Sequence, residues 1–229
     1  MLSSFLASLN IANTEAVIKK LDAFKAYLLE ENKKFNLTTI TDDREIDRKH
    51  FMDSLAAFPY IQGKVLDIGS GAGFPSVPLA VVCAQNSFTL VDSLRKRVDF
   101  LNRVIDLLKL THCTAIHTRI EDFPKKGTFD TVLARAVAKL NTLCEYALPF
   151  LNVGGAFIAY KTYGLELEEE IKEAEKALSV LGGEVEKVIQ VENEEIKDLH
   201  HALVLIRKKK NTPLCYPRGK NKPKMQPLS

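Results

Sequence analysis

A glycine-rich stretch follows a short apolar run in the first third of the chain. It reads Val65-Leu66-Asp67-Ile68-Gly69-Ser70-Gly71-Ala72-Gly73-Phe74. Glycines let the backbone turn tightly and approach a ligand closely, and a helix that begins beside such a turn offers free N–H groups. The stretch therefore predicts a buried strand, a nucleotide-binding loop and a helix. The alternative is a structural turn between strand and helix that binds nothing.

A second acidic residue, Asp92, ends another apolar run, Thr89-Leu90-Val91, and lies 23 positions after Gly69. A carboxylate in the crevice beyond the carboxyl ends of parallel strands suits the two hydroxyls of a ribose. Asp92 could instead cap the helix that follows it. Together with the glycine loop, it predicts a ligand that contains a nucleoside.

The order of residues around the loop separates two classes of cofactor. Dinucleotide sites usually read G-x-G-x-x-G, whereas in this chain Asp67 is followed by Gly69, Gly71 and Gly73. A carboxylate at this place disfavours a pyrophosphate and favours a cationic ligand. S-adenosylmethionine carries an ammonium and a sulfonium and no phosphate, so we predict it as the cofactor. A nicotinamide dinucleotide is the disfavoured alternative.

Further candidate side chains lie where the later strands would end. Ile120 can cover the face of an adenine, and the backbone near Glu121 can meet its edge, unless the segment is only a solvated acidic turn. Arg135 and Lys161 follow the next two strands, at the predicted junction of cofactor and substrate. We expect both to orient the substrate. The alternatives are a surface ion pair for Arg135 and a solvent-exposed lysine for Lys161.

The alternation of elements predicts the fold that positions these residues. Helical spacing over 14–34 and 46–58 predicts a helical cap within residues 1–62. Residues 63–207 alternate strands with helices, as in a mostly parallel α/β sheet, and the last two strands suit an antiparallel pair at the sheet edge. The predicted strands are 65–68, 88–91, 113–117, 131–133, 156–160, 184–191 and 201–206, and the predicted helices are 74–83, 93–109, 140–151 and 165–181.

Composition and the cysteines narrow the class of protein. The chain has 229 residues, of which 46% are hydrophobic and 27% charged, as expected for a soluble protein with one α/β domain. The longest apolar run is too short for a bilayer and no secretory signal is recognisable, so we expect a cytoplasmic protein without a membrane partner. The four cysteines are far apart, and the adjacent His200 and His201 would point to opposite faces of a strand. We therefore expect reduced cysteines and no metal.

The positive charge is concentrated at one end of the chain. Residues 207–229 contain eight basic and no acidic residues, so the net charge of +3 leaves −5 for residues 1–206. This asymmetry predicts a polyanionic partner for the segment 208–229, which we expect to be only partly ordered; a solvated basic tail is the alternative. We predict an RNA clamp from this tail and the N-terminal helices, made of Lys33, Lys34, Arg48, Lys49, His50, Lys208, Lys209, Arg218 and Lys220.

Several groups of residues form a set that spans nearly the whole chain. They are Asn32-Lys33-Lys34-Phe35-Asn36-Leu37-Thr38, His50 with Asp53-Ser54-Leu55, residues 67–75, Asp92-Ser93-Leu94 with Lys96-Arg97-Val98, Arg119 with Glu121, Arg135-Ala136, and Tyr216-Pro217-Arg218 with Pro223, Pro227 and Leu228. This set resembles the small-subunit (16S) ribosomal RNA guanine-N7 methyltransferases, the glucose-inhibited division protein B family. Methyltransferases in general lack the N-terminal and C-terminal groups.

The resemblance implies a Rossmann-like class I methyltransferase with a seven-stranded sheet, one antiparallel edge strand and an N-terminal helical cap. It implies methyl transfer from S-adenosylmethionine to N7 of one guanine, guanine 527, of 16S rRNA. The N7 lone pair has no proton to lose, so we assign no general acid or base. The implied partner is 16S rRNA or a small-subunit particle, and a monomer suffices for this activity.

The family's cofactor contacts fall by position on five residues, with Asp92 at the ribose. With the loop residues and Ser93 added, the predicted cofactor site consists of Asp67, Gly69, Ser70, Gly71, Phe74, Asp92, Ser93, Ile120, Glu121 and Arg135. The chain departs from the family at Ser76, Thr162 and Asn221, each of which replaces a usual glycine. Two alternatives stay open: a methyltransferase of this fold that acts on a small molecule or a protein, and a non-catalytic RNA-binding protein.

Overall fold

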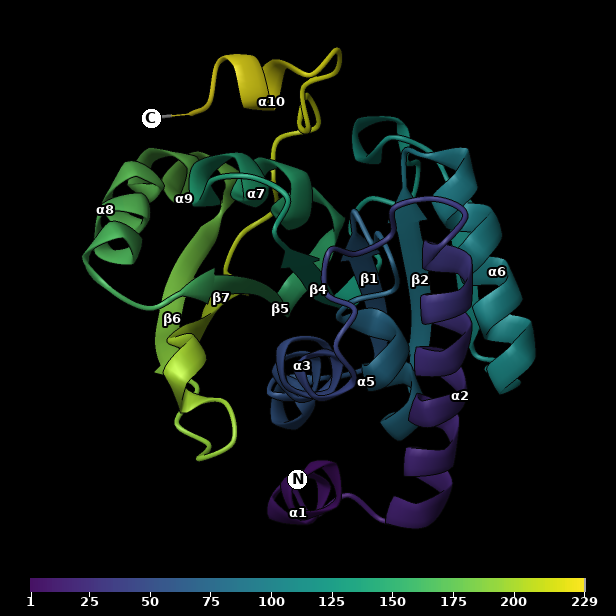
Figure 1. The fold of residues 1–229 in the computed structure, drawn as a ribbon. Coiled ribbons are helices and arrows are strands. Elements are labelled where there is room, and N and C mark those ends of the chain that lie inside the picture. The colour runs from purple at the N-terminus through teal and green to yellow at the C-terminus, as the bar shows by residue number, and fades with distance from the viewer. Residues whose placement is uncertain (229) are drawn as a thin grey trace.

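A seven-stranded sheet forms the middle layer of the molecule, and helices cover both of its faces (Figure 1). The computed structural model describes residues 1–228. The strand order is β3-β2-β1-β4-β5-β7-β6; β1 to β5 are parallel, and β7 is antiparallel to both of its neighbours. The strands are β1 Lys64–Ile68, β2 Ser87–Asp92, β3 Cys113–His117, β4 Phe129–Arg135, β5 Leu151–Thr162, β6 Gly183–Gln190 and β7 His201–Lys208. The predicted fold, a mostly parallel sheet with an antiparallel pair at one edge, is confirmed.

The apolar strands are buried on both sides because successive side chains point to opposite faces. In β1, Val65 packs into one hydrophobic core and Leu66 and Ile68 pack into the other. The helices of the first face are α1 Leu2–Ser8, α2 Thr14–Asn32, α5 Ser76–Val82 and α6 Arg95–Leu108, and those of the second are α7 Leu140–Ala147, α8 Leu165–Glu173 and α9 Glu175–Leu181.

The strand order reverses direction beside β1, since β2 lies on one side of it and β4 on the other. Loops that leave neighbouring strands in opposite directions open a crevice at this switch point. The glycine loop lies there, with φ angles of +71° at Gly69, +57° at Gly71 and +96° at Gly73. These left-handed conformations delay the following helix, which begins at Ser76 rather than at the predicted Phe74.

The N-terminal cap contains an irregular helix where the sequence predicted one regular helix over 46–58. It consists of α3 (Asp43–Ile46), a π-helical turn (Asp47–Met52) and α4 (Asp53–Leu55). A π-helical turn widens the helix and redirects side chains, and such turns are frequent at functional sites. Here it turns His50 and Asp53 toward the end of β4, where Arg135 lies.

Two other boundaries differ from the prediction for local reasons. The helix predicted over 165–181 is interrupted at Ala174, which separates α8 from α9. The segment 148–150 forms a 3₁₀ turn that contains Pro149, so α7 ends before it and β5 begins at Leu151 instead of residue 156.

The C-terminal segment folds back across α7 and ends in the short helix α10 (Lys222–Met225), drawn in yellow in Figure 1. Arg218 donates two hydrogen bonds to the Glu145 carboxylate, at 2.9 and 2.6 Å, and Glu145 is fully buried. Thr142 of α7 donates to the Pro223 carbonyl at 3.1 Å. The prediction of a partly ordered tail is therefore wrong for residues 208–228, because a buried carboxylate in α7 fixes the segment.

Candidate active site

Two cavities open side by side at the carboxyl ends of the parallel strands. The loop cavity, of about 440 Å³, lies among the loops after β1, β2 and β3. The cap cavity, of about 540 Å³, lies between the π-helical turn, the end of β5 and α8. Ala136 and Ala138, in the loop after β4, line both cavities. A ligand in one cavity would therefore be a direct neighbour of a ligand in the other.

The loop cavity brings together half of the predicted cofactor residues. Gly69, Asp92, Ser93, Ile120 and Glu121 all line it. They come from three separate loops, so only the parallel arrangement of β1, β2 and β3 makes them neighbours. Ile120 offers an apolar wall, and Asp92 offers carboxylate oxygens. This combination suits a flat base that is joined to a ribose.

The Asp92 carboxylate is held in place by backbone N–H groups of the neighbouring loops. Its Oδ2 accepts a hydrogen bond from the Gly71 N–H at 2.9 Å, and its Oδ1 accepts one from the Leu94 N–H at 2.8 Å. Asp92 Oδ2 also lies 3.5 Å from Arg97 Nη1. The N-cap residue of α6 is Leu94, so Asp92 holds the residue before the helix and is not itself the cap of the capping alternative. Because a carboxylate oxygen can accept two hydrogen bonds, Oδ1 still has acceptor capacity for a ribose hydroxyl.

Asp67 is a buried acid without a hydrogen-bonding partner. Its side chain is 1% exposed, and neither carboxylate oxygen accepts a hydrogen bond from any residue that the structure describes. Burial raises the pKa of Asp67 from its usual value of 3.8 to about 7, although the nearby Ser76 and Ser70 hydroxyls oppose this rise. A buried carboxylate without well-formed hydrogen bonds is costly, and a nearby cation would stabilise its charged form. The residue therefore fits a cofactor that carries an ammonium or a sulfonium.

The other predicted cofactor residues do not line the loop cavity. Ser70 and Asp67 are buried beneath its surface, and Gly71 is bound to Asp92. The Phe74 ring packs against Phe24 and other aromatic side chains in the core. The cofactor contact predicted at Phe74 stays a prediction, which the backbone of this residue would have to make. Its ring is needed to bury the inner face of the cap.

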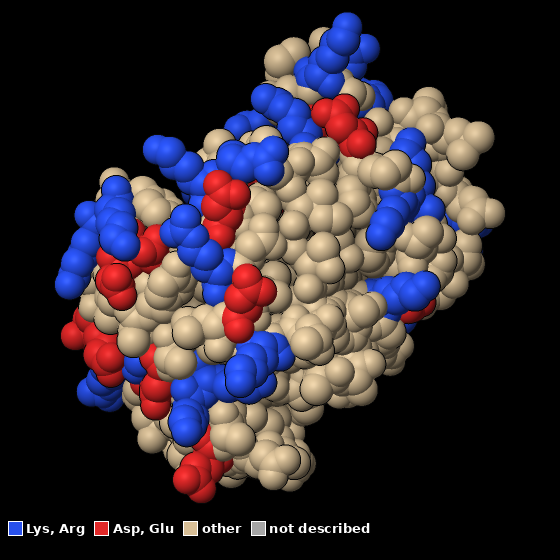
Figure 2. All heavy atoms as spheres, turned by 90° about the vertical axis from the view of Figure 1, so that its right-hand side faces the viewer, with Lys and Arg blue, Asp and Glu red and all other residues tan. Residues whose placement is uncertain are grey.

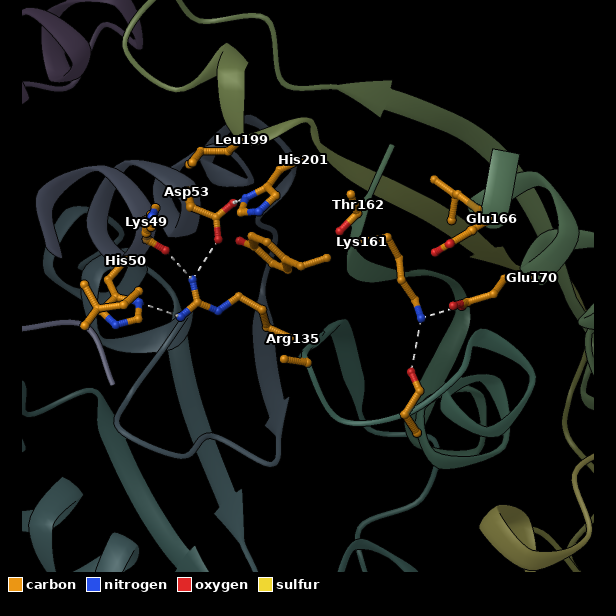
Figure 3. Close-up of a pocket in the computed structure, with 15 residues that line it drawn as sticks. Lys49, His50, Asp53, Arg135, Lys161, Thr162, Glu166, Glu170, Leu199 and His201 are labelled. Carbon is orange, nitrogen blue, oxygen red and sulfur yellow. Dashed lines mark hydrogen bonds and ion pairs between the residues drawn. The ribbon is translucent and has the colours of Figure 1, made fainter. Parts of the chain in front are cut away.

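Arg135 lies in the cap cavity and joins the sheet to the N-terminal cap (Figure 3). Its Nη1 donates to Asp53 Oδ2 at 2.7 Å and to the Lys49 carbonyl at 3.2 Å. Its Nη2 donates to His50 Nδ1 at 3.2 Å, and the second Asp53 oxygen lies 2.6 Å from His201 Nδ1. The Arg135 side chain is therefore not an ordinary surface ion pair, and its predicted cofactor contact stays a prediction. It closes a buried network between β4, the cap and β7.

His50 is buried and uncharged. Burial and the neighbouring Arg135 lower the pKa of His50 to about 4. Its ring stacks on Phe74 with centroids 4.3 Å apart. Because its Nδ1 accepts from Arg135, its proton lies on Nε2, which donates to Thr38 Oγ1 at 2.8 Å. The ring carries no positive charge and little of its surface is exposed, at the wall of the cap cavity, so His50 is not suited to bind a phosphate and its RNA contact stays a prediction.

Lys161 points into the cap cavity from the end of β5 (Figure 3). Its ammonium donates to Glu170 Oε2 at 2.5 Å and to the Ala138 carbonyl at 3.1 Å. The side chain is 12% exposed, so Lys161 is not a solvent-exposed surface lysine. The structure places it where the sequence predicted a substrate-orienting residue, beside the loop that separates the two cavities.

Three of the residues predicted to contact RNA already have hydrogen-bonding or ion-pair partners within the protein. Lys208 is 2% exposed and donates to the Leu181 carbonyl, and burial lowers its pKa to about 8. Arg48 is paired with Asp198 and donates to the Glu195 carbonyl. Arg218 forms the ion pair with the buried Glu145 that is described above. The prediction for Lys208 is wrong, because its side chain is buried. Arg48 and Arg218 are part-exposed, so their RNA contacts stay predictions.

The other predicted RNA contacts keep a more open position. Lys33, Lys34, Lys209 and Lys220 are exposed, and Lys49 is half-buried at the edge of the cap cavity. Lys34 and Lys209 have acidic neighbours, Glu31 for the first and Glu184 for the second, at 2.5 and 3.5 Å. The ammonium groups available to a polyanion therefore lie on two distant parts of the chain, the end of α2 and the C-terminal segment.

Some residues of the two cavities escaped the sequence analysis. Asn221 and Lys224 of the C-terminal segment line the loop cavity, although both are about a hundred residues away from the loops in the sequence. His201 and Glu170 line the cap cavity. Glu170 is one of many acidic residues in α8, so no pattern marks it. Asp53 could have been singled out from the sequence, because it belongs to the group of His50 with Asp53-Ser54-Leu55 that carries the family resemblance.

The three departures from family glycines all lie near the cavities. Thr162 lines the cap cavity and Asn221 the loop cavity. Asn221 has φ +60°, a left-handed conformation that asparagine tolerates better than most residues. Ser76 is fully buried, and its hydroxyl has no hydrogen-bonding partner within residues 1–228. Of the three, only Asn221 therefore has a backbone conformation that favours glycine.

None of the helices within residues 1–228 is both long enough and apolar enough to span a bilayer. In the same part of the chain, no group of three or more histidine, cysteine, aspartate or glutamate side chains is arranged to hold a metal ion.

Comparison with known proteins relates this geometry to one family. The family model for rRNA small subunit methyltransferase G (GidB) matches residues 17–200. Proteins named ribosomal RNA small subunit methyltransferase G from Desulfitobacterium hafniense and Alkaliphilus oremlandii are 46% and 44% identical to this chain. Both alignments cover 96% of this chain, with 93% and 94% of the relatives covered. The solved structure of a SAM-dependent methyltransferase from Aquifex aeolicus shares the fold, with a TM-score of 0.55 at 16% identity over 79% of this chain and 98% of its own.

Proposed function

The chain belongs to the rRNA small subunit methyltransferase G family, and on this premise we propose that it methylates N7 of one guanine, guanine 527, of 16S rRNA. It is a methyltransferase that uses S-adenosylmethionine and acts on small-subunit rRNA. The observation that carries the proposal is the pair of adjoining cavities, one with nucleoside-binding features and one with polar groups suited to a base. Ala136 and Ala138 separate their ligands by no more than a shared wall.

The loop cavity is the proposed cofactor site. Asp92 would accept hydrogen bonds from the ribose hydroxyls, and Ile120 would cover the adenine face. Asp67 would balance the positive charge of the methionine part from beneath the loop. When bound, S-adenosylmethionine supplies an electrophilic methyl group. Everything else in the transfer depends on how the protein holds the acceptor base beside it.

The reaction needs no general base, because guanine N7 already presents a lone pair. The protein has to hold that lone pair in line with the methyl group and keep other groups away. Alignment of two reactants in this way can lower a barrier by roughly 7 to 11 kcal/mol. Lys161 is the proposed orienting donor, with guanine O6 as its acceptor. A donor placed on N7 itself would block the attack.

Arg135 orients the site indirectly in this proposal. Both of its terminal nitrogens donate to the N-terminal cap, so it fixes the position of His50 and Asp53 against the sheet. This holds the wall of the cap cavity that faces Lys161. A predicted cofactor contact of Arg135 would have to involve its backbone or its Nε.

The proposed RNA partner is a small-subunit particle or its 16S rRNA, and the proposed location is the cytoplasm. The exposed lysines of the end of α2 and of the C-terminal segment, Lys33, Lys34, Lys209 and Lys220, would contact phosphates. A monomer suffices, since all lining residues of both cavities come from one chain.

Replacement of the target guanine by 7-deazaguanine tests the proposed acceptor atom. This analogue keeps O6, N1 and N2 but carries C–H in place of N7, so it has no lone pair to attack with. The enzyme should bind small subunits with either base equally well and transfer a labelled methyl group only to those with guanine. Transfer of label to the 7-deazaguanine subunits at the guanine rate would rule out N7 as the acceptor.

A further inference from the structure

The cap cavity contains two donor–acceptor pairs, Arg135 with Asp53 and Lys161 with Glu170 (Figure 3). Such pairs can read the edge of a base, because a base edge is itself a row of donors and acceptors. Which pair reads the base depends on the hydrogen-bonding capacity that remains after contacts within the protein are counted.

The pair of Arg135 and Asp53 is closed. Both terminal nitrogens of Arg135 are engaged by Asp53, His50 and the Lys49 carbonyl. One Asp53 oxygen accepts from Arg135 and the other faces His201 at 2.6 Å. The Asp53 side chain is only 3% exposed. This pair holds the cap in place and has little left to offer to a ligand.

The pair of Lys161 and Glu170 is open. The Lys161 ammonium has three N–H groups, of which two are directed at Glu170 Oε2 and the Ala138 carbonyl. Glu170 Oε2 also accepts from the Leu140 N–H at 3.0 Å, whereas no residue within 1–228 donates to Glu170 Oε1. One N–H and one carboxylate oxygen therefore remain, side by side, at the wall of the cavity. Their side chains are 12% and 26% exposed, which leaves them accessible to a base.

This arrangement matches guanine and mismatches adenine. Around the guanine ring, acceptor N7 is followed by acceptor O6, then by the donor N1–H and the donor N2 amino group. A lysine N–H beside a carboxylate oxygen complements O6 and N1–H in that order. Adenine presents a donor amino group and an acceptor N1 at the same places, so neither hydrogen bond could form and two buried polar groups would stay unpaired.

A second carboxylate in the cavity, that of Glu166, could accept a hydrogen bond from the N2 amino group of guanine. Glu166 is one turn before Glu170 on α8, lines the same cavity and is exposed. Side chains four residues apart on a helix lie on one face. Glu166, drawn beside Glu170 in Figure 3, is therefore the acceptor available to the N2 amino group.

We propose that Lys161 and Glu170 together read the Watson–Crick edge of the target guanine, and that Glu170 sets the base specificity of the methyl transfer. This inference rests on the proposed function and names the residue that selects its substrate. With O6 and N1–H held at α8, N7 is the next atom around the ring and is left free to face the cofactor cavity. Adenine also has a nucleophilic N7, so the enzyme would reject it through the hydrogen-bonding pattern of its Watson–Crick edge and not through the reacting atom.

Small subunits whose 16S rRNA carries guanine, inosine or 2,6-diaminopurine at the target position provide the test. Inosine keeps O6 and N1–H but lacks the N2 amino group, and 2,6-diaminopurine presents the adenine pattern with N2 retained. The wild-type enzyme should methylate guanine and inosine faster than 2,6-diaminopurine, by roughly 5- to 150-fold, as expected for one bidentate contact. The variant Glu170→Gln, whose amide can also donate to N1, should lose most of this ratio. The matched control Glu169→Gln, an exposed neighbour on α8 that does not line the cavity, should keep it.

The outcomes separate this inference from the proposed function. If the wild-type enzyme methylates no guanine subunits, the proposed function fails and the inference fails with it. If guanine is methylated but Glu170→Gln keeps the wild-type ratio, only the inference fails. Cofactor binding reports whether the variant is folded. If the variant does not fold, the wild-type rates alone decide. Equal methylation rates for guanine and 2,6-diaminopurine would overturn the inference. Faster methylation of both guanine and inosine than of 2,6-diaminopurine would support it.

Discussion

Asp67 shows how a single side chain can prepare a site for its ligand. A buried carboxylate without hydrogen bonds is unfavourable, and burial raises its pKa to about 7. The folded protein thus holds this proton more tightly than the unfolded chain does. The contribution of Asp67 to stability is therefore lost as the pH rises from about 4 to 7. A bound cation would reverse this, since it stabilises the charged carboxylate.

The affinity for S-adenosylmethionine should consequently depend on pH through Asp67. Below about pH 7 the carboxyl is protonated, so binding has to release a proton and the dissociation constant should rise by roughly tenfold for each pH unit down to about 5. Titration calorimetry in buffers of different ionisation enthalpy measures both the affinity and the released proton. The variant Asp67→Asn should bind more weakly at pH 7 and show no proton release. Proton release that persists in this variant would contradict the role of Asp67.

Lys161 should matter for the methyl transfer and not for the cofactor. Lys161→Ala removes the donor for guanine O6, so turnover on small subunits should fall roughly 10- to 150-fold, the range for a hydrogen bond to a charged group. Cofactor affinity should stay within about twofold, because Lys161 does not line the loop cavity. Lys172→Ala, an exposed lysine of the same region, serves as the control. Wild-type turnover in Lys161→Ala, or a fall in turnover that is matched by an equal fall in cofactor affinity, would contradict this division.

Among the elements, the π-helical turn determines how the cap meets the sheet. It brings Asp53 within 2.7 Å of Arg135, and both groups are largely removed from water. Removing one partner of a buried pair leaves an unpaired charge, which typically costs about 3 to 5 kcal/mol. Asp53→Ala should therefore lower the free energy of unfolding by about 3 kcal/mol in denaturant titrations. Glu186→Ala, which breaks the more exposed pair with Arg207, should cost less than about 1 kcal/mol.

The C-terminal segment should stabilise the cofactor site more than the RNA complex. Arg218 pins it to the buried Glu145, and this places Asn221 and Lys224 at the loop cavity. Arg218→Ala should release the segment, open one wall of the cavity and weaken S-adenosylmethionine binding by roughly tenfold, with a loss of about 3 kcal/mol of stability from the unpaired Glu145. The control Lys220→Ala leaves the anchor intact and should keep wild-type cofactor affinity. Equal effects of the two changes on cofactor binding would refute this role.

The elements that could be predicted are those whose sequence pattern is local. The first strand, the glycine loop and Asp92 could be predicted because a strand that is buried on both faces is a short apolar run, and left-handed turns favour closely spaced glycines. The π-helical turn was not, since the apolar spacing of residues 46–58 also fits a regular helix. The fixed tail and its place beside the loop cavity depend on one interaction, between Arg218 and Glu145, whose partners are 73 residues apart in the sequence. The basic composition of the tail pointed to a solvated segment instead.

At the scale of the whole molecule, positive charge is unevenly distributed. Figure 2 shows lysines and arginines interspersed with acidic residues over much of one side, and cations that project at the end where the C-terminal segment lies. Some cations are held by partners within the fold, as Arg48 is by Asp198 and Lys208 by the Leu181 carbonyl. The field that attracts RNA therefore comes from the exposed lysines and arginines and not from the sum of all basic residues.

The salt dependence of RNA binding measures how many lysines take part. Replacing Lys33, Lys34 and Lys220 by glutamine should flatten the slope of log affinity against log salt by roughly 0.7 for each phosphate of single-stranded RNA that the variant no longer binds. Lys109→Gln at the C-terminal end of α6, an exposed lysine that lines neither cavity, should leave the slope unchanged. An unchanged slope in the triple variant would show that these lysines do not bind phosphates.

Methyl transfer to N7 of a single guanine of 16S rRNA can be checked by mapping the product nucleotide. Small subunits that lack the modification are incubated with the enzyme and methyl-labelled S-adenosylmethionine, and the rRNA is digested and sequenced by mass spectrometry. We expect one labelled nucleotide, 7-methylguanine at guanine 527. Label on another base or another atom, or no label in rRNA while the cofactor still binds, would contradict the proposed function.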